Sequence, residues 1–600
     1  MPEGAIARAD FESVVPEIVP FRVPRAIQRI LVRALRIGEL ESIYDLLRSM
    51  TDSQPFPERL LALLSISYRA SDVELRRIPQ TGPVLVIVNH PFGILEGAVL
   101  ASLLGRIRAD LRFLGNRILM RVPEIRNLVI PLETNSGCDA VVSNSRALKK
   151  ALDHLSAKGL LILFPAGEVS HFQWKMKAIS DPQWGPTSAW IVEVAARLGI
   201  CVPVIPMYFS GANSALFHVM GMLHPGFRTA LLCRELLNKR GRSVEVRIGS
   251  TVRPEKLLAI SDESDRIRYL RWRTYLLAGL GQYKPRTRLG LRRRIETKCG
   301  MESVAEAQPS TALAGEIATL DPLVKAGELE VYLTTAGRVP SVLHELGRLR
   351  EVTFRAAKEG TGKPLDIDSF DATYLHLFVW NPRRQEIIGA YRMAATDRVS
   401  HGGLYTAALF GYRREFLDWL GAALELGRSF IRQEYQRSFA PLLLLWKGIG
   451  RFISQNPRYK MLFGPVSISN RYHALSRELM VSFLEQRASV ANFAGHRDVR
   501  GYTVRGVHRP IFPQSGFDIE DLSAVISDVE QDQSGVPVLL RHYLKLGGRL
   551  LGFQIDRKFS DALDGLILVD LTKTEPKLLG RYLGSREAAD FLAHHNMGRS

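Results

Sequence analysis

Residues 84–97 read VLVIVNHPFGILEG, and this stretch decides the fold of the first half of the chain. Val84–Val88 are apolar and mostly β-branched, a pattern typical of a buried strand. The Asn-His-Pro sequence centred on His90 ends that strand, because proline cannot donate a hydrogen bond to a sheet. Gly93 permits a tight turn, and the apolar residues from Ile94 to Leu104 predict a helix.

Glu96 falls in the first turn of this predicted helix, close behind His90 in the sequence. A histidine and a carboxylate are therefore presented together at the carboxyl end of a buried strand, where the ligands of open α/β sheets bind. The alternative interpretation is a core histidine accompanied by a solvated glutamate. The motifs further along the chain favour a site.

Length and charge limit the class of protein. Six hundred residues are too many for one core, so we expect two domains or more. With 46% hydrophobic and 24% charged residues the composition is that of a globular protein, which excludes disorder for most of the chain. The net charge of +19 fits three classes of partner, namely nucleic acid, anionic lipid and acidic carrier proteins.

Cysteine usage and hydropathy indicate the compartment. Four cysteines lie far apart without a CxxC pair, so we predict neither a disulfide framework nor a metal site, as suits a reducing cytosol. Residues 1–20 contain four acidic residues and lack the apolar core of a secretory signal. Residues 82–104 are apolar, but Asn89, His90 and Glu96 would be costly in lipid, so we expect no transmembrane segment.

Residues 21–50 predict an amphipathic helix, with apolar side chains at helical spacing between arginines. Such a basic helix can lie on an anionic membrane surface, or it can pack on its own domain with the arginines in solvent. Residues 56–70 repeat the pattern more weakly. We therefore assign residues 1–70 to N-terminal amphipathic helices and leave both interpretations open.

Strands alternating with helices over residues 71–295 indicate a domain with a mostly parallel sheet. The predicted strands are 84–88, 160–164, 201–209 and 243–248, and a helix is predicted at 187–198. The end of this domain is strongly basic, above all at residues 284–294.

Residues 297–322 are small, polar and weakly patterned, and we place a linker at 296–325. A second α/β domain is predicted at 326–575, followed by a C-terminal tail at 576–600. Its predicted strands are 331–334, 374–380, 387–393, 424–431 and 461–469, and its predicted helices are 343–354 and 441–453. The fold class expected for the chain is therefore α/β, in two domains.

Three motifs of the first half occur in a recognisable order, namely NHPFGILE at 89–96, FPAGE at 164–168 and VPVIP at 202–206. Over about residues 20–260 the pattern resembles the glycerolipid acyltransferases, the family that includes lysophosphatidate acyltransferases. The resemblance implies that His90 removes the proton of an acceptor hydroxyl, which then attacks an acyl thioester, while Glu96 orients the imidazole. It also implies substrate contacts at Asn89, Gly93, Gly167, Glu168 and Ser170.

The first half departs from that family in two ways. The usual spacing would place the acid at Leu95, whereas here it is Glu96, one position later and one methylene longer. The block Phe-Pro-Glu-Gly-Thr-Arg of the family is Phe-Pro-Ala-Gly-Glu-Val-Ser here. Because arginine is the preferred bidentate partner of a phosphate, its absence predicts an acceptor without phosphate. Lys175 and Lys177 remain as alternative point charges.

The motifs of the second half are DIDSFD at 366–371, GAYR at 389–392, ELGRSF at 425–430 and LFGPVS at 462–467. Over about residues 328–570 they resemble the ornithine N-acyltransferase branch of the GNAT acetyltransferase fold, related to acyl-homoserine lactone synthases. The resemblance implies that an amine is positioned against a thioester carbonyl whose oxyanion is stabilised by backbone donors. The loop Gln433–Phe439 would receive the phosphopantetheine of the donor at a helix N-terminus, although it lacks the glycine-rich consensus.

In this scheme Glu425 is the catalytic candidate of the second half. Asp368 and Asp371 are candidates for accepting the proton of the amine or for binding its cationic side chain. Arg392 and Arg428 would be partners of a carboxylate or structural residues. A purely structural alternative pairs Glu425 with Arg428 across a strand end.

A chain that joins these two halves resembles the bifunctional bacterial ornithine lipid synthases. The resemblance implies that the C-terminal half attaches a 3-hydroxyacyl group to the α-amine of ornithine. The N-terminal half would then acylate the new hydroxyl of lyso-ornithine lipid. The expected co-substrates are 3-hydroxyacyl and acyl groups on acyl carrier protein, without a bound cofactor.

The positive charge fits both an acidic acyl carrier protein and an anionic bilayer, so we expect a peripheral enzyme on the cytoplasmic face of a bacterial inner membrane. Other enzymatic interpretations are an amino-acid lipid synthase for glycine, serine or glutamine, and a phospholipid acyltransferase with one degenerate domain. A non-enzymatic interpretation is a basic module that binds membrane surfaces. Binding of nucleic acid is not expected, because no aromatic-basic repeat or groove-reading motif is present.

Overall fold

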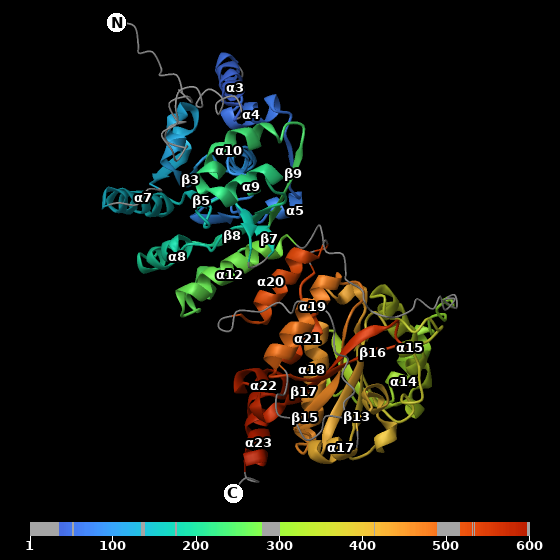
Figure 1. The fold of residues 1–600 in the computed structure, drawn as a ribbon. Coiled ribbons are helices and arrows are strands. Elements are labelled where there is room, and N and C mark those ends of the chain that lie inside the picture. The colour runs from blue at the N-terminus through green and yellow to red at the C-terminus, as the bar shows by residue number, and fades with distance from the viewer. Residues whose placement is uncertain are drawn as a thin grey trace. The chain divides into compact units, whose positions relative to one another are not determined.

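The computed structural model describes residues 35–50, 53–133, 138–174, 177–278, 301–412, 414–488, 517–530, 532 and 534–596. The chain divides into two compact units, and both are mixed α/β, which confirms the predicted fold class (Figure 1). Unit 1 is residues 1–284 together with 512–529, and unit 2 is residues 285–511 together with 530–600.

Unit 1 is built on a seven-stranded sheet in the order β1-β9-β8-β2-β5-β3-β4. Neighbouring strands pair in parallel except β8 and β9, which are antiparallel, while β6 and β7 form a separate pair. The strands are β1 (Ser67–Arg69), β2 (Val84–Val88), β3 (Leu111–Asn116), β4 (Val129–Leu132), β5 (Leu160–Leu163), β6 (His171–Gln173), β7 (Ala178–Ser180), β8 (Val204–Phe209) and β9 (Ser243–Ile248).

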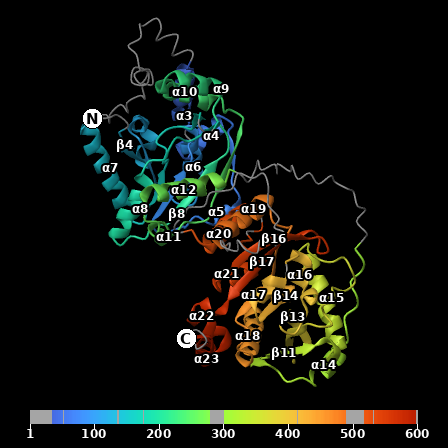
Figure 2. The same cartoon turned by 60° about the horizontal axis from the view of Figure 1, so that its bottom comes forward.

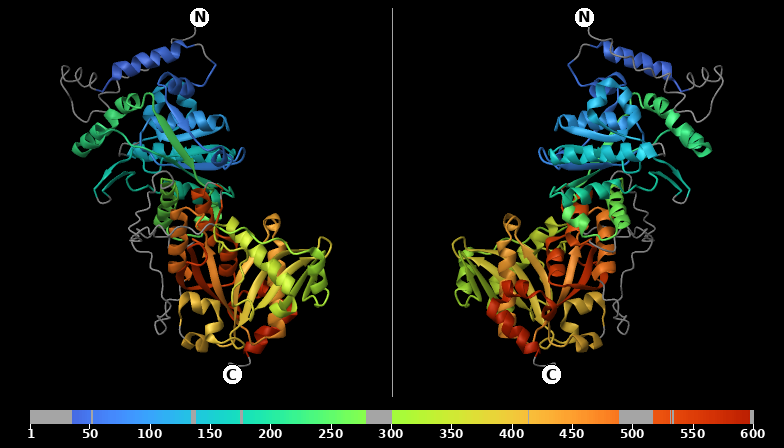
Figure 3. Two further views of the ribbon diagram at one scale, coloured as in Figure 1. Left: turned by 90° about the vertical axis from the view of Figure 1, so that its right-hand side faces the viewer. Right: turned by 90° about the vertical axis from the view of Figure 1, so that its left-hand side faces the viewer.

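Helices lie on both faces of this sheet, as Figure 3 shows. A mostly parallel sheet needs this cover because its strands are apolar on both faces, and every residue of β2 is buried. The helices are α3 (Ile37–Ser49), α4 (Phe56–Leu63), α5 (Asp72–Leu75), α6 (Leu95–Gly105), α7 (Cys138–Ser156), α8 (Thr187–Arg197), α9 (Ala215–Leu223), α10 (Pro225–Leu237), α11 (Pro254–Leu258), α12 (Glu263–Leu276) and α20 (Ile519–Val529).

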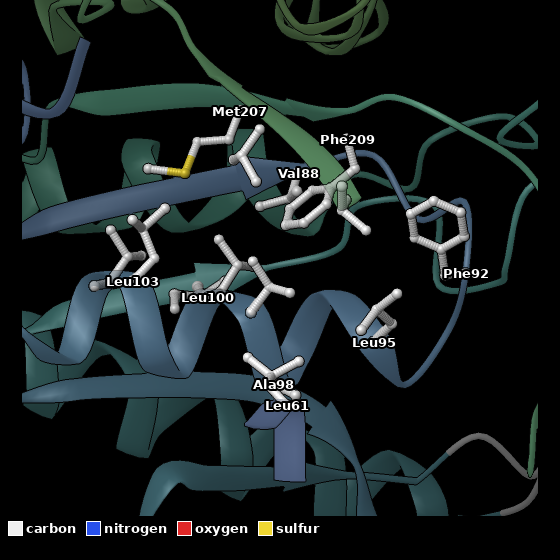
Figure 4. Close-up of a cluster of buried hydrophobic side chains, with 14 of the residues drawn as sticks. Leu61, Val88, Phe92, Leu95, Ala98, Leu100, Leu103, Met207 and Phe209 are labelled. Carbon is white, nitrogen blue, oxygen red and sulfur yellow. The ribbon is translucent and has the colours of Figure 1, made fainter. Parts of the chain in front are cut away.

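Helix α6 lies at the centre of the core of unit 1. Its side chains are apolar on nearly every side, a property of fully buried helices, and they pack against Val88, Met207 and Phe209 of the sheet (Figure 4). Phe92, in the turn that precedes the helix, belongs to the same cluster. The turn that carries His90 is therefore held between a buried strand and a buried helix.

Helix α3 covers part of the stretch that predicted a basic amphipathic helix. Its apolar side chains Ile37, Leu40, Ile43, Tyr44 and Leu47 are buried within unit 1. For residues 37–49 the structure thus supports packing on the chain's own domain, the second of the two interpretations. Residues 21–34, with most of the arginines, lie outside the described residues.

Helix α20 belongs to unit 1 although it lies late in the sequence. Asp528 of this helix is buried and forms an ion pair with Arg77 at 2.7 Å, and its second oxygen lies 3.5 Å from Arg273. The same carboxylate accepts hydrogen bonds from the backbone and the hydroxyl of Ser250. The sequence predicted two consecutive domains and gave no sign of this discontinuity.

Unit 2 is built on an eight-stranded sheet in the order β10-β11-β12-β13-β14-β15-β17-β16. Neighbours pair antiparallel except β14 and β15, which are parallel. The strands are β10 (Val324–Ala326), β11 (Leu329–Thr335), β12 (Leu375–Asn381), β13 (Glu386–Ala395), β14 (Ala423–Ile431), β15 (Met461–Ile468), β16 (Arg549–Asp556) and β17 (Ala562–Asp570).

The two faces of this sheet are covered by different helices, with α15 and α18 on opposite sides (Figure 2). Tyr332 and Phe378 pack with α15, whereas Val331 and Leu377 contact Gly448 of α18. The helices are α14 (Ser310–Ile317), α15 (Pro340–Ala356), α16 (Tyr405–Phe410), α17 (Arg414–Leu420), α18 (Ala440–Gln455), α19 (Ala474–Phe483), α21 (Val538–Lys545), α22 (Pro576–Leu583) and α23 (Ser585–Asn596).

Two segments of unit 2 differ from their prediction. The stretch predicted as a linker contains α14, whose Leu313 and Ile317 are buried in the core with α15. The residues predicted as a tail form α22 and α23, and α22 packs on α18. Small residues at these positions gave a weak pattern although they form helices, because tertiary packing supplies the stability that local sequence lacks.

In the ranges that the structure describes, no helix is both long and apolar enough to cross a membrane.

Candidate active sites

The first candidate site lies at the carboxyl edge of the sheet of unit 1. β2, β5 and β8 are parallel neighbours, so the residues that follow these strands meet at one edge. His90 follows β2 and Phe164 follows β5, and their rings stack with centroids 4.3 Å apart. Two of the sequence motifs are thus in direct contact.

Glu96 faces the His90 ring, with 3.3 Å between its Oε1 and the Nδ1 of the imidazole. The same oxygen accepts backbone hydrogen bonds from Phe92 at 2.5 Å and from Gly93 at 3.1 Å. The side chain of Glu96 is fully buried, whereas 17% of the His90 side chain is exposed. Two amides therefore fix the carboxylate against Nδ1, which leaves Nε2 of His90 for a substrate.

The unusual spacing of His90 and Glu96 is compatible with this geometry. Leu95, where the family carries its acid, points into the core and is 1% exposed. Glu96 is one residue further into α6, and its longer side chain reaches back across the turn. Gly93 permits that turn, since its φ is +101° and a Cβ there would lie 2.6 Å from Leu232.

Asn89 has a structural role at this edge. Its Nδ2 donates to the carbonyl of Phe209 at 3.0 Å, and its Oδ1 accepts from the amide of Phe209 at 2.7 Å. Both polar groups of the side chain are therefore occupied by the end of β8. This finding disagrees with the prediction that Asn89 binds substrate.

Sequence reasoning missed Asp181, a fully buried residue that supports His90. Its Oδ1 accepts hydrogen bonds from the His90 amide at 3.1 Å and from the Ser170 hydroxyl at 2.5 Å. Its Oδ2 accepts from Trp184 at 2.9 Å, and the Ser170 amide donates to the His90 carbonyl at 2.7 Å. Ser170 is thus part of the scaffold that holds His90, and Asp181 stood in no motif that could have revealed it.

The Phe-Pro-Ala-Gly-Glu block ends in an ion pair. Gly167 adopts a φ of +67°, and the exposed Glu168 accepts a hydrogen bond from Arg228 at 2.9 Å. A guanidinium therefore reaches this block through space from α10, but Glu168 already balances its charge. Lys177 is exposed, and Lys175 lies outside the described residues.

The second candidate site is a group of charged side chains on one face of the sheet of unit 2. Strand registers place Arg392 opposite His376, Glu425 opposite Ala394 and Phe463, and Asp564 opposite Ser467, so these side chains share a face. We call this group the ionic cluster; its members are Arg350, Asp366, Asp368, Asp371, His376, Arg392, Glu425, Arg428, Asp556 and Asp564.

Glu425 is 1% exposed and is surrounded by hydrogen-bond donors. Its Oε1 accepts from the Tyr374 hydroxyl at 3.0 Å, and its Oε2 accepts from the Thr406 hydroxyl at 2.9 Å. Burial raises the pKa of this carboxyl to about 7, although both hydrogen bonds oppose the shift. A group with this pKa can accept and release a proton near neutral pH.

Asp371 is a structural ion-pair residue. Its Oδ1 lies 2.7 Å from Arg350, and its Oδ2 lies 3.0 Å from Arg392 and accepts the Asp368 amide. Despite burial, the two guanidinium groups hold its pKa well below the usual range. Nε2 of His376 donates to the Asp371 carbonyl at 2.9 Å, and burial lowers the pKa of this histidine to about 4.

Arg428 does not pair with Glu425, so the structural alternative for these two residues is wrong. Its Nε lies 3.1 Å from Asp366, and its guanidinium stacks over the Tyr405 ring at 4.8 Å. Asp368 lies 2.6 Å from Arg392 and 3.8 Å from Arg428. The predicted acids and arginines are thus brought together, but mostly as partners of one another.

Several members of the cluster were missed by sequence reasoning. Arg350 lies in an amphipathic helix, where an arginine normally points to solvent, and Asp556 and Asp564 lie in strands that the sequence did not reveal. Tyr405 joins two parts of the cluster, since its amide donates to the Tyr374 hydroxyl and its own hydroxyl donates to Asp556. These residues carry no local signal, because strand pairing and the packing of α15 and α16 bring them to the site.

The strands β14 and β15 diverge beside Glu425. Their parallel pairing covers Ala423–Glu425. Beyond these residues β14 stays paired with β13, and β15 stays paired with β17. The backbone of β14 beyond Glu425 is thus free of strand pairing on one side. The loop Gln433–Phe439 follows this strand and leads into α18, and its role in donor binding stays a prediction.

Among the described residues, no group of three histidine, cysteine, aspartate or glutamate side chains is placed to hold a metal ion.

Comparisons with known proteins match both units. A family model described as "Acyltransferase" matches residues 18–280, and one described as "Acetyltransferase (GNAT) domain" matches residues 349–447. A relative from Phocaeicola vulgatus named "Glycine N(alpha)-acyltransferase" is 33% identical over 40% of this chain and 79% of its own length. A protein of the same name from Bacteroides thetaiotaomicron is 32% identical over 40% of this chain and 77% of its own length.

A further relative from P. vulgatus, named "Lyso-glycine lipid O-acyltransferase", is 27% identical over 30% of this chain and 62% of its own length. The matched family models cover both units, and they and the relatives are all named for acyl transfer. The chain belongs to the acyltransferase family of the two N-acyltransferases above, and it is an acyltransferase with an acyltransferase domain ahead of a GNAT domain.

Proposed function

We propose that this chain makes an amino-acid lipid in two steps, as a bifunctional ornithine lipid synthase. Unit 2 transfers a 3-hydroxyacyl group from acyl carrier protein to the α-amine of ornithine. Unit 1 transfers a second acyl group to the hydroxyl of the resulting lyso-ornithine lipid. The proposal is carried by one observation, the presence in one chain of a buried Glu425 with a pKa of about 7 and a separate His90–Glu96 pair.

In the N-acylation step, the neutral α-amine attacks the thioester carbonyl. The C–N bond forms and the C–S bond breaks, and the departing thiolate receives the single proton of the amine by way of Glu425. Glu425 accepts the proton that the amine nitrogen loses, which suits its pKa. Backbone amides of β14 beyond Glu425, which are not paired with β15, would stabilise the oxyanion.

In the O-acylation step, Nε2 of His90 removes the proton of the lipid hydroxyl as the oxygen attacks the second thioester. The C–O bond forms, the C–S bond breaks, and the imidazolium gives its proton to the departing thiolate. Glu96 faces Nδ1 and stabilises the imidazolium that forms. Asp181 and Ser170 hold the backbone of His90 in place. A phosphate-free acceptor is consistent with the Glu168–Arg228 pair, because the only guanidinium described at this block is already balanced.

The net charge of +19 supports two partners of this enzyme, an acidic acyl carrier protein and an anionic membrane surface on the cytoplasmic side of the inner membrane. Residues 284–294, the most basic stretch, lie outside the described residues. Glycine is the second candidate substrate, favoured by the names of the relatives.

Lipid mass spectrometry tests the proposal in a bacterium that lacks aminolipids and is fed isotopically labelled amino acids. The wild-type chain should form diacylated ornithine lipid, His90→Ala should stop at the monoacylated form, and Glu425→Gln should form neither. If labelled glycine appears in the product in place of ornithine, glycine is the substrate. Absence of any amino-acid lipid from a folded wild-type chain would refute the proposed function.

A further inference from the structure

The ionic cluster carries more negative than positive groups. Within the described residues it holds six carboxyl groups against three guanidinium groups. The arginines are used by Asp366, Asp368 and Asp371, each of which lies within 3.1 Å of a guanidinium. These acids are therefore not available to bind an additional cation, and the unbalanced charge lies elsewhere in the cluster.

Asp564 of β17 is one of three acids in the cluster, with Glu425 and Asp556, for which the structure describes no ion pair with an arginine. It is 2% exposed, and its Oδ1 has no hydrogen-bond partner in the part of the chain that the structure describes. The residues that influence it are Ser467, which donates a hydrogen bond, the like-charged Asp556, and Arg428, which is engaged with Asp366. Burial raises the pKa of Asp564 to about 7. A buried carboxyl oxygen without a partner is costly, and a donor group on a bound ligand would satisfy it.

The cation described near Asp564 is Arg428, which is engaged with Asp366, and further acids lie close by. Asp556 accepts hydrogen bonds from the Tyr405 hydroxyl and from the Lys558 amide, so its own oxygens are satisfied. Glu359, at the end of α15, is 8% exposed, and burial together with the charge of Asp564 raises its pKa to about 7. This end of the cluster is thus suited to a positively charged group.

Asp564 and Glu425 lie at opposite ends of the cluster. Glu425 pairs with Phe463 of β15, and Asp564 pairs with Ser467, four residues further along the same strand. At about 3.3 Å per residue and about 4.8 Å between strands, their Cα atoms lie roughly 16 Å apart. The two side chains extend over part of that distance, and Tyr405 connects the two ends through Tyr374 and Asp556.

We propose that Asp564 binds the side-chain ammonium of a dibasic amino acid whose α-amine reacts beside Glu425. An extended diamino acid such as ornithine separates its two nitrogens by about 6 Å, so with a hydrogen bond of about 2.8 Å at each end it can join carboxyl oxygens about 12 Å apart, a distance shorter than the roughly 16 Å between the two Cα atoms. Glycine, serine and glutamine offer no second ammonium and would leave Asp564 unpaired. This inference rests on the N-acyltransferase activity proposed for unit 2.

The test measures selectivity of the purified full-length chain between ornithine and norvaline, which has the same carbon skeleton without the side-chain ammonium. Asp564→Asn should lower the ratio of kcat/KM for ornithine over norvaline by about 30- to 100-fold, because a charge-assisted hydrogen bond is lost. Asp561→Asn is the matched control. Asp561 is exposed in the turn between β16 and β17, and its φ of +56° is one that asparagine tolerates.

The outcomes separate this inference from the proposed function. If the wild-type chain acylates norvaline or glycine as well as ornithine, and Asp564→Asn leaves the ratio unchanged, the assignment of Asp564 is wrong while N-acylation stands. If no amine is acylated by wild type, the proposed function itself fails. Binding of ornithine measured by calorimetry without acyl donor provides a second readout, since it should weaken in Asp564→Asn and not in Asp561→Asn.

Discussion

Replacement of Glu425 by glutamine should make unit 2 more stable and less active, and both effects should become larger as the pH rises. Burial raises the pKa of Glu425 from 4.5 to about 7, so the folded state disfavours the charged carboxylate. The shift corresponds to about 3 kcal/mol of lost stability above pH 7, where the carboxyl must ionise in the folded protein. At pH 5 the folded carboxyl keeps its proton and most of this cost is absent.

The Glu425→Gln variant cannot ionise, so it should gain about 2–3 kcal/mol over wild type when the pH is raised from 5 to 8. The glutamine amide also changes the hydrogen bonds with Tyr374 and Thr406. A change in stability that is the same at both pH values cancels when the stability differences at pH 5 and pH 8 are compared. Asp564 and Glu359 titrate in both proteins, so their contributions also cancel to first order.

Activity should change in the other direction. The wild-type rate of N-acylation should fall about tenfold per pH unit below pH 7, as Glu425 becomes protonated. The variant should be slower by about 10²- to 10⁴-fold at pH 8 and should lack this pH dependence. O-acylation of supplied lyso-lipid by unit 1 is the internal control and should be unaffected.

The measurements are thiol release from acyl carrier protein and hydrogen exchange of the β13 and β14 amides, which reports opening of unit 2 by itself. The reasoning would be refuted if the stability difference were the same at pH 5 and pH 8. An unchanged rate of N-acylation would show that Glu425 is only a structural residue.

Glu96→Asp withdraws the carboxylate from His90 by about 1.5 Å, so kcat for O-acylation should fall about 100-fold. N-acylation should be unchanged. A normal kcat for O-acylation would contradict the orienting role of Glu96. Gly93→Ala places a Cβ 2.6 Å from Leu232 at a φ of +101°, so denaturation of unit 1 should show a loss of about 1–3 kcal/mol. Asp371→Asn removes the carboxylate that pairs with the buried Arg350, while Arg392 keeps Asp368, and it should cost unit 2 about 3–5 kcal/mol near pH 7. Because the pKa of Asp371 is lowered, the difference in free energy of unfolding between wild type and this variant should shrink as the pH falls below about 4. A stability difference that does not change with pH would argue against the ion pairs.

The sequence by itself determined the parts of this protein that depend on local pattern. The apolar run of β2, the proline that ends it and the buried helix after Gly93 predicted the turn that presents His90 and Glu96. Several strands and helices of both units were also predictable, because their periodicity arises from the faces that they bury, whereas β16, β17 and α7 were not predicted. The acyltransferase class followed from motifs that lie within these elements.

Only the tertiary structure decided which charged residues act together. Strand pairing, which carries no local signal, places Asp564 on the same face as Glu425, and the packing of a distant segment brings Asp181 against the backbone of His90. It also showed that Asp371 is bound by two arginines, one of them Arg350 on a helix surface that looked solvent-exposed in the sequence. The electrostatic character of a buried acid depends on burial and on neighbours from distant segments, and a linear sequence contains neither.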